Sequence, residues 1–392
     1  MKIAAVIGTR PEAVKMAPLI TELKRRGLFS VVTVAAAQHR EMLDGALDSF
    51  GISAEYDLDI MESSQSLCGI AARCIERLEK VLLKEKPGLV LVHGDTATTL
   101  ASALTAAYCG IEVGHVEAGL RSYDTGNPFP EEHNRVLTDA LSKFHFAPTP
   151  GNRGNLLREN ISEEGIFVTG NTGIDALLSA AERDIPPENP VLREFESRRF
   201  VLVTAHRREN FGEPITRICG GLAETAGRHP DVSFVYPVHP NPEISGPVNR
   251  LLSGIGNVLL TGPVSYPDMA WLLKRCYLCV TDSGGIQEEA PSLGKPVLVL
   301  REVTERPEAV QAGTVKVIGA GRGAISEWAG RLLSDESFYR GFSARRNPYG
   351  DGKASGRIAD FLEYSCGFRE LRPEEWAPEE REGSGPGELA EG

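Results

Sequence analysis

The sequence predicts an α/β fold in which two doubly wound parallel sheets face each other across a cleft. Short β-branched runs alternate with longer amphipathic runs through residues 2–170, and the alternation starts again after Pro186 and Pro187. Strands that alternate with helices form parallel sheets whose faces are covered by those helices. The 392 residues are enough for two or three domains of about 150 residues each.

The first Rossmann-like domain is expected over residues 1–170. Its predicted strands are short apolar runs, and the segments between them have helical periodicity. We predict strands over residues 2–7, 31–37, 88–93, 111–116, 144–148 and 165–170, and helices over 12–26, 40–50, 96–108 and 130–141.

The second Rossmann-like domain is expected over residues 171–352. Ligands of such folds bind beyond the carboxyl ends of the strands, so two facing domains place the ligand between them. We predict strands over residues 200–205, 232–238, 257–261, 277–282, 295–300 and 313–318, and helices over 213–228, 267–275 and 286–293.

After the second domain, the sequence predicts a helix and then an acidic tail. We expect the helix over residues 353–366 to pack back on the first domain. Residues 368–392 contain eight Glu and three Arg, with Pro and Gly throughout. Such a composition is typical of disorder, so we expect a disordered tail without a catalytic role.

Charge and cysteine content restrict the partners and the location. The net charge is −12, which disfavours nucleic acid as the main partner. No apolar run reaches about 18 residues, which excludes a membrane-spanning helix, and the first residues lack a signal-peptide cleavage region. The seven cysteines are odd in number and scattered, which is typical of reduced thiols. We expect a cytoplasmic protein, with Cys276 and Cys279 as core residues.

The first candidate motif is the turn Gly8–Glu12, which follows the first predicted strand. A glycine turn before a helix lets the backbone approach an anion, and Arg10 and Lys15 add cations on the same side. The alternative is a tight turn with surface charges.

Two further strands end in charged groups. His93, Gly94 and Asp95 follow one strand, and Glu117 follows the next. Buried charges are costly unless they are paired or used. The structural alternatives are core positions for the histidines, helix capping by Asp95 and an ion pair between Glu117 and Arg121.

The segment from Asn127 to Arg135 supplies a third carboxylate. Pro130 suits the first turn of a helix, and Glu131 has the spacing of an ion pair with Arg135. In the functional interpretation, Glu131 joins Asp95 and Glu117 in one cluster, where neighbouring carboxylates separate into an acid and a base.

The second predicted domain carries two motifs at strand ends. One runs from Thr204 to Asn210 and contains His206. The other has Ser283, Gly284 and Gly285 at the start of a helix, where free N–H groups suit a diphosphate. Glu289 on that helix is placed to accept the hydroxyls of a ribose. The alternative is a loosened helix start with solvated glutamates.

Together these motifs indicate an enzyme that acts on a nucleotide sugar. They combine cations and helix N-termini for a diphosphate, a carboxylate for ribose and several acid/base groups. The sequence contains no GxxxxGK[ST] motif, which disfavours ATP hydrolysis. It contains no HExxH motif and no paired CxxC motifs, which disfavours a zinc enzyme.

From Met1 to about Tyr364 the chain resembles the non-hydrolysing UDP-N-acetylglucosamine 2-epimerases. The resemblance implies a glycosyltransferase-B-like pair of domains, a homodimer, and reversible conversion of UDP-N-acetylglucosamine to UDP-N-acetylmannosamine without a cofactor or metal. It rests on GTRPEAVKMAPLI, QHREML, HGDTATTLASAL, GHVEAGLRS, FPEEHNRVLTD, TGNTGIDAL, VTAHRREN, YPVHPNP and TDSGGIQEEAPSLGKPVLVLREVTERPEAV.

The resemblance also implies roles for individual residues. Its reaction removes the C2 proton as UDP leaves C1, and then returns a proton to the other face of the resulting 2-acetamidoglucal. The implied catalytic residues are Asp95, Glu117, Glu131 and His206; the substrate-binding residues are Arg10, Lys15, Arg135, Ser283, Gly284, Gly285, Glu289 and Arg306; and Gln38, His39, Arg73, Arg207 and His239 match an activator site for a second UDP-N-acetylglucosamine.

Other functions stay open at this point. They are epimerisation of a more modified UDP-sugar, a hydrolysing epimerase that releases UDP, a glycosyltransferase of the same architecture, and a non-catalytic nucleotide-sugar sensor. The absence of a basic amphipathic segment disfavours a membrane-associated glycosyltransferase. The number of strand-end carboxylates disfavours a sensor, because binding alone does not require them.

Overall fold

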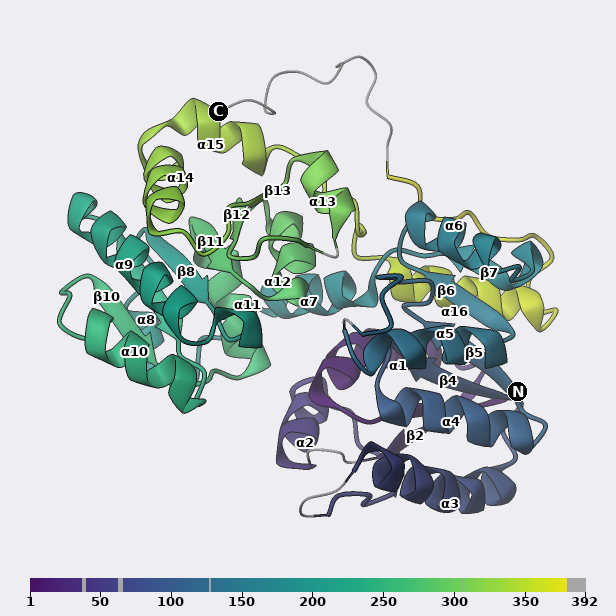
Figure 1. Cartoon of the computed structure of the whole chain (residues 1–392). Coiled ribbons are helices and arrows are strands. Elements are labelled where there is room, and N and C mark those ends of the chain that lie inside the picture. Colours follow the sequence, from purple (N-terminus) through teal and green to yellow (C-terminus); the bar gives the residue numbers. More distant parts are fainter. Residues whose placement is uncertain (37–39, 63–65, 127, 305, 379–392) are drawn as a thin grey trace.

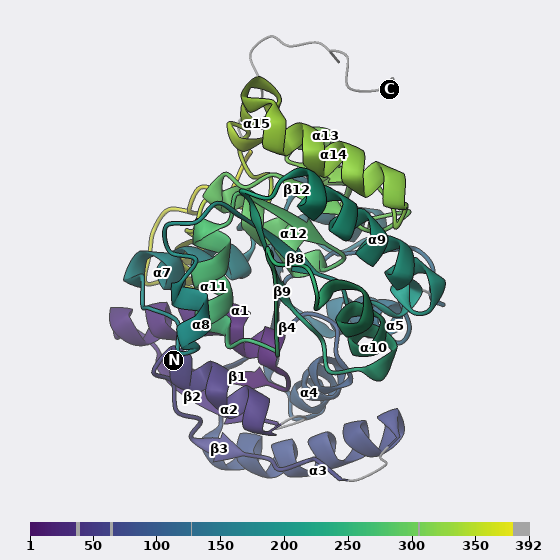
Figure 2. The same cartoon turned by 90° about the vertical axis from the view of Figure 1, so that its left-hand side faces the viewer.

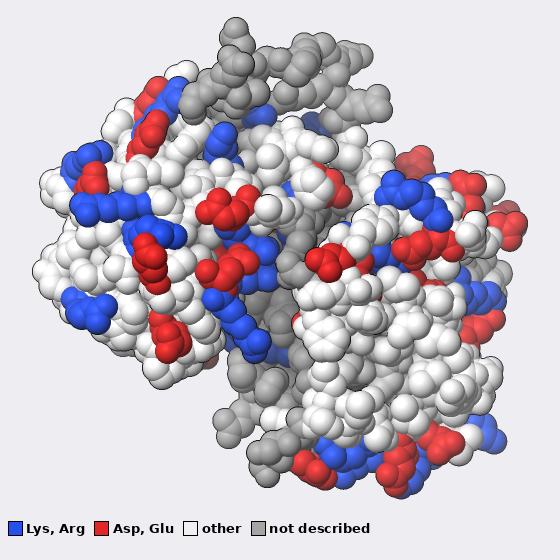
Figure 3. Space-filling model, viewed as in Figure 1, with Lys and Arg blue, Asp and Glu red and all other residues white. Residues whose placement is uncertain are grey.

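The computed structural model describes residues 1–36, 40–62, 66–126, 128–304 and 306–378. They form two lobes, each built on a parallel sheet, with a groove between them (Figures 1 and 3). The predicted α/β class with two doubly wound parallel sheets is therefore confirmed.

The seven-stranded sheet of the first lobe has the order β3-β2-β1-β4-β5-β6-β7. The chain adds strands on one side of β1 and then returns to continue on the other side, so the switch point lies between β1 and β4. The strands are β1 (Lys2–Ile7), β2 (Ser30–Ala35), β3 (Tyr56–Asp57), β4 (Leu89–His93), β5 (Glu112–Val116), β6 (Phe144–Ala147) and β7 (Ile166–Val168).

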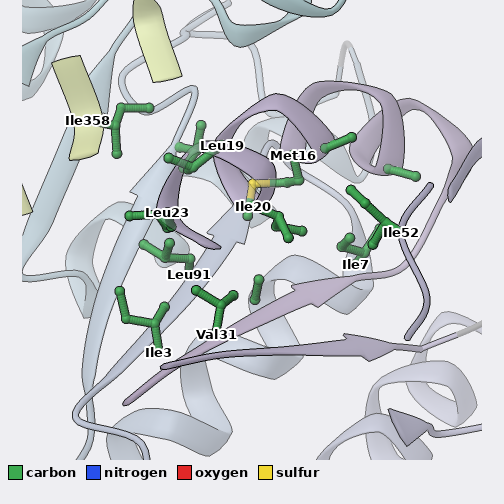
Figure 4. Close-up of a cluster of buried hydrophobic side chains, with 14 of the residues drawn as sticks. Ile3, Ile7, Met16, Leu19, Ile20, Leu23, Val31, Ile52, Leu91 and Ile358 are labelled. Atoms are coloured by element: carbon green, nitrogen blue, oxygen red, sulfur yellow. The ribbon is translucent and has the colours of Figure 1, made fainter. Parts of the chain in front are cut away.

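Helices cover both faces of this sheet. On one face, Met16, Leu19 and Ile20 of α1 pack on Ile3 and Ile7 of β1, because their helical spacing places them on one side of α1 (Figure 4). The opposite face is covered by α3 and α4. The helices are α1 (Arg10–Arg26), α2 (Arg40–Ser49), α3 (Leu67–Glu85), α4 (Ala97–Tyr108), α5 (Glu131–Leu141) and α6 (Pro150–Arg158). The patterns in the sequence did not predict α3.

The six-stranded sheet of the second lobe has the order β10-β9-β8-β11-β12-β13, with the switch point between β8 and β11. Helices α9 and α14 lie side by side over it (Figure 2). The strands are β8 (Phe200–Thr204), β9 (Ser233–Pro237), β10 (Val258–Thr261), β11 (Leu278–Thr281), β12 (Val297–Val299) and β13 (Val315–Val317), and the helices are α9 (Glu213–Arg228), α10 (Pro242–Leu252), α11 (Tyr266–Arg275), α12 (Gly284–Glu289), α13 (Pro307–Ala312), α14 (Arg322–Ser334) and α15 (Glu336–Ser343).

Two connections join the lobes. The chain leaves the first lobe after β7 and continues through α7 (Thr172–Arg183) and α8 (Pro190–Arg193). It returns through residues 347–353 to α16 (Ala354–Ser365), which packs on α1 and α7. The ring of Phe361 in α16 stacks on Phe167 of β7, with a centroid distance of 4.7 Å. The last helix therefore belongs with the core of the first lobe.

The segment after α16 differs from the expected disordered tail. The Trp376 backbone N–H donates to Val168 O at 2.8 Å, and Glu375 forms a 2.7 Å ion pair with Arg153. Pro373 is buried. The expectation of disorder is therefore wrong for residues 368–378, because a few aromatic and proline contacts offset the ordering entropy. Residues 379–392 lie outside the described part of the chain.

None of the helices in the described ranges is long and apolar enough to cross a membrane.

Candidate active site

The predicted motifs meet at the groove between the lobes because each follows the carboxyl end of a strand. In the first lobe, the Gly8 turn follows β1 and Asp95 follows β4, so both lie at the switch point. In the second lobe, His206 follows β8 and Ser283 follows β11, which again flank the switch point. Lys and Arg side chains gather on the wall that the second lobe presents to the groove (Figure 3).

Glu117 lies at the end of β5 and has three polar neighbours. Its Oε2 forms an ion pair with Lys15 Nζ, accepts a 3.0 Å hydrogen bond from Asn171 Nδ2, and lies 3.7 Å from His93 Nε2. Its backbone has a φ of 68°, a left-handed conformation that is costly for a residue with a side chain. Burial alone would raise the pKa of Glu117, but the charge of Lys15 lowers it. Glu117 is therefore held as a carboxylate.

The structural alternative, in which Glu117 pairs with Arg121, is wrong. Arg121 turns away and donates to Asp139 at 2.7 Å and to Glu159 at 2.6 Å. Asp139 also bonds His115 Nδ1 at 2.6 Å, whose other ring nitrogen contacts Gly94 O. His115 is thus a structural histidine that ties the end of β4 to α5.

His93 is buried next to Glu117. Burial lowers the pKa of His93 to about 3, so the imidazole is neutral at physiological pH. Neither ring nitrogen has a hydrogen-bond partner among the described residues. A buried polar ring without a partner is unusual and indicates a site for a ligand or water.

Asp95 is oriented by Arg135. Arg135 Nη2 donates to Asp95 Oδ2 at 2.6 Å, and Arg135 Nη1 donates to Glu132 Oε2 at 3.1 Å. The predicted pairing of Arg135 with Glu131 is therefore wrong. The helix cap is also different, because Thr96 and not Asp95 caps α4.

Glu131 is the first residue of α5. Its Oε2 is buried and has no hydrogen-bond partner among the described residues. Asp95, Glu117 and Glu131 therefore differ in their surroundings, since the first is paired with an arginine, the second with a lysine, and the third keeps an oxygen for a ligand.

The turn after β1 is closed by Glu12, a residue that the sequence did not single out. Glu12 Oε2 accepts from Gly8 N at 2.7 Å, and Glu12 Oε1 accepts from Thr9 Oγ1 at 3.1 Å. A Cβ on Gly8 would lie 2.7 Å from Thr98, so this turn requires glycine. Burial raises the pKa of Glu12 to about 7. Arg10, which follows the turn, is exposed at the groove.

His206 lies in the second lobe on a loop that Asp282 holds in place. Asp282 Oδ2 accepts 2.8 Å hydrogen bonds from His206 N, Arg207 N and Asn210 Nδ2. Asp282 Oδ1 lies 3.4 Å from His206 Nδ1. Burial lowers the pKa of His206, while the charge of Asp282 opposes that change. Sequence patterns did not distinguish Asp282 from the other residues of the TDSGG motif.

The start of α12 has the features expected of a phosphate site. Ser283 precedes the helix, and its backbone N–H donates to Thr281 Oγ1 at 2.9 Å. The Arg306 guanidinium lies close over Gly284, where a Cβ would come within 2.9 Å of its Cζ. A side chain at Gly284 would thus displace the cation from the helix N-terminus.

Glu289 is the last residue of α12. Burial raises the pKa of Glu289 to about 8, with Glu288 and Glu117 adding to the effect and Lys15 opposing it. Glu288, its neighbour, binds Asn171 and Arg306. Asn171 and Glu288 are the other residues that the sequence did not identify.

The activator-site residues are only partly brought together. The rings of His239 and His206 stack with a centroid distance of 5.8 Å, and Arg207 follows His206 in the same loop. Arg73 lies on α3 in the first lobe, where it donates to Ile60 O and pairs with Glu62. Gln38 and His39 lie outside the described residues.

The family comparison decides between the remaining interpretations of the site. The family model described as UDP-N-acetylglucosamine 2-epimerase matches residues 21–363. The chain belongs to this family. The UDP-N-acetylglucosamine 2-epimerase of Escherichia coli K12 is 50% identical over 370 residues, which cover 92% of this chain and 98% of the relative. The resemblance read from the motifs is thereby confirmed.

Solved structures of the family superpose on the whole fold. The UDP-GlcNAc 2-epimerase from Neisseria meningitidis, bound to UDP-GlcNAc, matches with a TM-score of 0.85 and 47% identity over 92% of this chain and 99% of that chain. The enzyme from Methanocaldococcus jannaschii, in complex with UDP-GlcNAc and UDP, matches with a TM-score of 0.77 and 35% identity over 93% and 100%.

The two-lobed architecture extends beyond the epimerases. The glycotransferase of kitacinnamycin matches with a TM-score of 0.63 at 16% identity, over 92% of this chain and 98% of that chain. At that identity the likeness concerns the fold alone. It supports the glycosyltransferase-B-like arrangement that the family resemblance implied.

Proposed function

We propose that this protein interconverts UDP-N-acetylglucosamine and UDP-N-acetylmannosamine by inverting C2 of the sugar. The observation that carries the proposal is that acid/base residues of the first lobe and diphosphate-binding groups of the second lobe border the same groove. The first lobe supplies Asp95, Glu117 and Glu131, and the second supplies a helix start and Arg306 for the diphosphate. The family to which the chain belongs carries the name of this reaction.

Elimination and re-addition of UDP would achieve the inversion without a redox step. A base takes the C2 proton, the C–H electrons form the C1=C2 double bond, and the C1–O electrons leave with the diphosphate. The products are UDP and 2-acetamidoglucal. A proton then returns to the opposite face of C2 while UDP adds again to C1. The two faces of C2 require two acid/base groups in different positions. The three carboxylates of the first lobe, which differ in their surroundings, can supply them.

The second lobe would stabilise the leaving group. The Ser283 hydroxyl, the backbone N–H groups of Gly284 and Gly285 and the guanidinium of Arg306 can offset the charge that develops on the diphosphate. His206, held by Asp282, faces the groove from the same lobe. Glu289 would accept the ribose hydroxyls, and Arg10 and Lys15 would add cations from the first lobe.

Incubation of UDP-N-acetylglucosamine in heavy water tests this proposal. We expect deuterium at C2 in both epimers, measured by proton NMR. Epimer formation without solvent deuterium would contradict the elimination route. Free UDP that accumulates would instead indicate a hydrolysing enzyme, and turnover only with an added acceptor would indicate a glycosyltransferase.

The variant Asp95→Asn separates catalysis from binding. The amide keeps a hydrogen-bonding group for Arg135 but cannot act as a base. We expect C2 deuteration to be lost while UDP binding, measured by calorimetry, persists. Unchanged turnover would remove Asp95 from the mechanism.

We also propose that the protein is a homodimer formed through the first lobe. Tyr108 at the end of α4 is 78% exposed. Leu137 on the adjacent α5 is 50% exposed. Exposed apolar surface of this kind is typical of protein interfaces. Light scattering should give a dimer for the native chain and for the control Ile185→Asp, and a monomer for Leu137→Asp.

We propose, finally, that a second UDP-N-acetylglucosamine molecule acts as an activator near Arg207 and His239. The proximity of His239 to His206 supports coupling of such a site to the catalytic groove. The reaction started from UDP-N-acetylmannosamine alone should then show a lag that added UDP-N-acetylglucosamine removes. A reverse reaction that begins at full rate would contradict the proposal.

A further inference from the structure

Asn171 occupies the point where the two connections between the lobes touch. It is the residue before α7, immediately after the chain leaves β7. Its backbone N–H donates at 2.7 Å to Tyr349 O, which lies in the connection that returns to the first lobe. The side chain is buried, with the residue 3% exposed. Asn171 is therefore fixed to both connections at once.

The side-chain amide of Asn171 has only one orientation that satisfies its neighbours. Its Oδ1 accepts from Gly173 N at 2.8 Å and so caps α7. With the oxygen committed to the helix, the Nδ2 group must face the other way. It donates to Glu117 Oε2 at 3.0 Å and to Glu288 Oε2 at 2.8 Å.

These two carboxylates lie in different lobes. Glu117 lies among the acid/base groups, and Glu288 lies beside the groups proposed to bind the diphosphate. Glu117 follows β5 and lies in the acid/base group of the first lobe. Glu288 lies on α12, between the diphosphate turn and Glu289, and accepts from Arg306 Nε at 2.9 Å. Asn171 is thus the link in a continuous chain of polar contacts from Arg306 to Glu117.

A neutral donor is required at this position for electrostatic reasons. Two buried carboxylates that share one neighbour repel each other unless a donor separates them. Lys15 offsets the charge of Glu117, and Arg306 offsets that of Glu288. The Asn171 amide donates a hydrogen bond to each carboxylate, so it links their positions directly, whereas the charge of Lys15 acts on both of them through space.

We propose that Asn171 is a positioning residue that holds Glu117 in its reactive orientation and ties that orientation to the nucleotide-binding helix α12. This inference rests on the proposed function. A shift of α12 towards the diphosphate moves Glu288, and Asn171 passes that shift to Glu117. The orientation of the base at C2 is thereby coupled to the position of the diphosphate on α12.

The variant Asn171→Ser tests the donor without removing the helix cap. Serine can accept from Gly173 N but is too short to reach both carboxylates. We expect kcat to fall by about 100-fold, the cost of displacing a reacting group by about 1 Å, with the Kd for UDP unchanged. The acidic limb of the pH profile of kcat/KM should move to higher pH, because a carboxylate that loses a donor binds its proton more tightly.

The matched control is Asn189→Ser. Asn189 caps α8 in the same way, through a 3.1 Å hydrogen bond from Val191 N. It makes no other hydrogen bond that the structure records for its side chain. We expect this variant to keep the native kcat and the native pH profile, which separates the effect of the cap from that of the bridge.

The variant Asn171→Asp distinguishes positioning from capping most sharply. Aspartate is as good a helix cap as asparagine and suits the helix dipole, so a cap-only role predicts native activity. The proposal predicts a larger loss of kcat than in Asn171→Ser, because a third carboxylate replaces the donor. In the Glu117→Gln background, Asn171→Ser should add little further loss, since it acts through Glu117.

The outcomes separate the inference from the proposed function. If the native protein incorporates deuterium at C2 and Asn171→Asp does so at the native rate, the inference is wrong while the proposed function stands. If the native protein incorporates no deuterium, both are wrong. A thermal unfolding scan identifies any variant that has lost its fold, and the control Asn189→Ser sets the scale for loss of a cap.

Discussion

At the scale of single residues, Glu117 depends on Lys15 for its charge. The two side chains are each 14% exposed, so water contributes little to their solvation. An opposite charge within a few ångströms lowers a carboxylate pKa by about 1–3 units. The ion pair therefore keeps a base available in a place where burial alone would protonate it.

The variant Lys15→Met tests this dependence. It removes the ammonium group and keeps the apolar stem, so the pKa of Glu117 rises and the ionised form is lost at a higher pH. We expect the acidic limb of kcat/KM to move up by about 1–3 pH units. The control is Lys24→Met on the same helix, whose pair with Glu55 is exposed. An unmoved acidic limb in Lys15→Met would contradict the assignment.

For Glu12, unlike Glu117, the effect of burial outweighs that of its polar neighbours, so its pKa is raised and the stability of the protein should depend on pH. Its folded-state pKa is raised from 4.5 to about 7, so the folded chain binds more protons than the unfolded chain between these values. The stability that this proton provides is complete below about pH 4.5 and is lost as the pH rises to about 7. Relative to Glu12→Gln, the native protein should lose up to about 3 kcal/mol across this window.

Urea unfolding at pH 5 and at pH 8 measures that difference. Glu22→Gln on the same helix is an informative control, because Arg25 and Arg26 lower the pKa of Glu22. Its contribution is therefore present at neutral pH and is lost on acidification. Equal pH dependence in the native protein and in Glu12→Gln would show that Glu12 ionises normally.

Residue types could be predicted as functional from the sequence, but their partners could not. Glu117 was identified because a carboxylate at the end of a buried strand is costly. The sequence suggested Arg121, four residues away, as an alternative partner, whereas the structure pairs Glu117 with Lys15, 102 residues away. Sequence spacing favours local pairs, and the packing of α1 against the strand ends overrides that preference.

At the scale of elements, two loops of the second lobe act as one unit. Asp282, after β11, accepts three hydrogen bonds from the loop after β8. Asp282 is completely buried, and its carboxylate supplies the acceptor for the backbone N–H groups of His206 and Arg207. The position of His206 thus depends on Asp282, which lies 76 positions further along the chain.

Asp282→Asn should therefore impair catalysis through the loop. The amide places a donor against backbone N–H groups that need an acceptor, so the loop and His206 shift. We expect kcat to fall by about 10- to 100-fold, measured as C2 deuteration. Asp268→Asn is the control, because Asp268 is also buried and also accepts a backbone N–H, from Glu188. It should lower stability and leave the C2 exchange rate intact.

Strands were easier to predict than the segments that depend on contacts across the molecule. Residues 2–7 and 200–204 form strands as predicted, because buried parallel strands are continuous apolar runs. Helix α3 was not predicted, and residues 368–378 were expected to be disordered. The order of that last segment depends on Val168 and Pro348, which no local pattern reveals.

At the scale of the whole molecule, the position of the groove followed from topology. Two doubly wound sheets place their ligand beyond the strand ends at the switch points, and Asp95 and Ser283 lie there. The contacts that join the lobes could not be predicted from the topology, because they depend on the relative orientation of the two sheets. Asn171 and Glu288 meet only through that arrangement.

The segment after α16 contacts β7 and the returning connection between the lobes, and it should contribute to the stability of the protein. Trp376 N–H donates to Val168 O before the outgoing connection, and Trp376 Nε1 donates to Pro348 O in the returning one, at 3.3 Å. Deletion of residues 368–392 should lower the free energy of unfolding by about 1–3 kcal/mol, measured in urea. Deletion of residues 379–392 is the matched control, because it keeps every one of these contacts. If both deletions unfold at the native urea concentration, the segment rests on the first lobe without stabilising it.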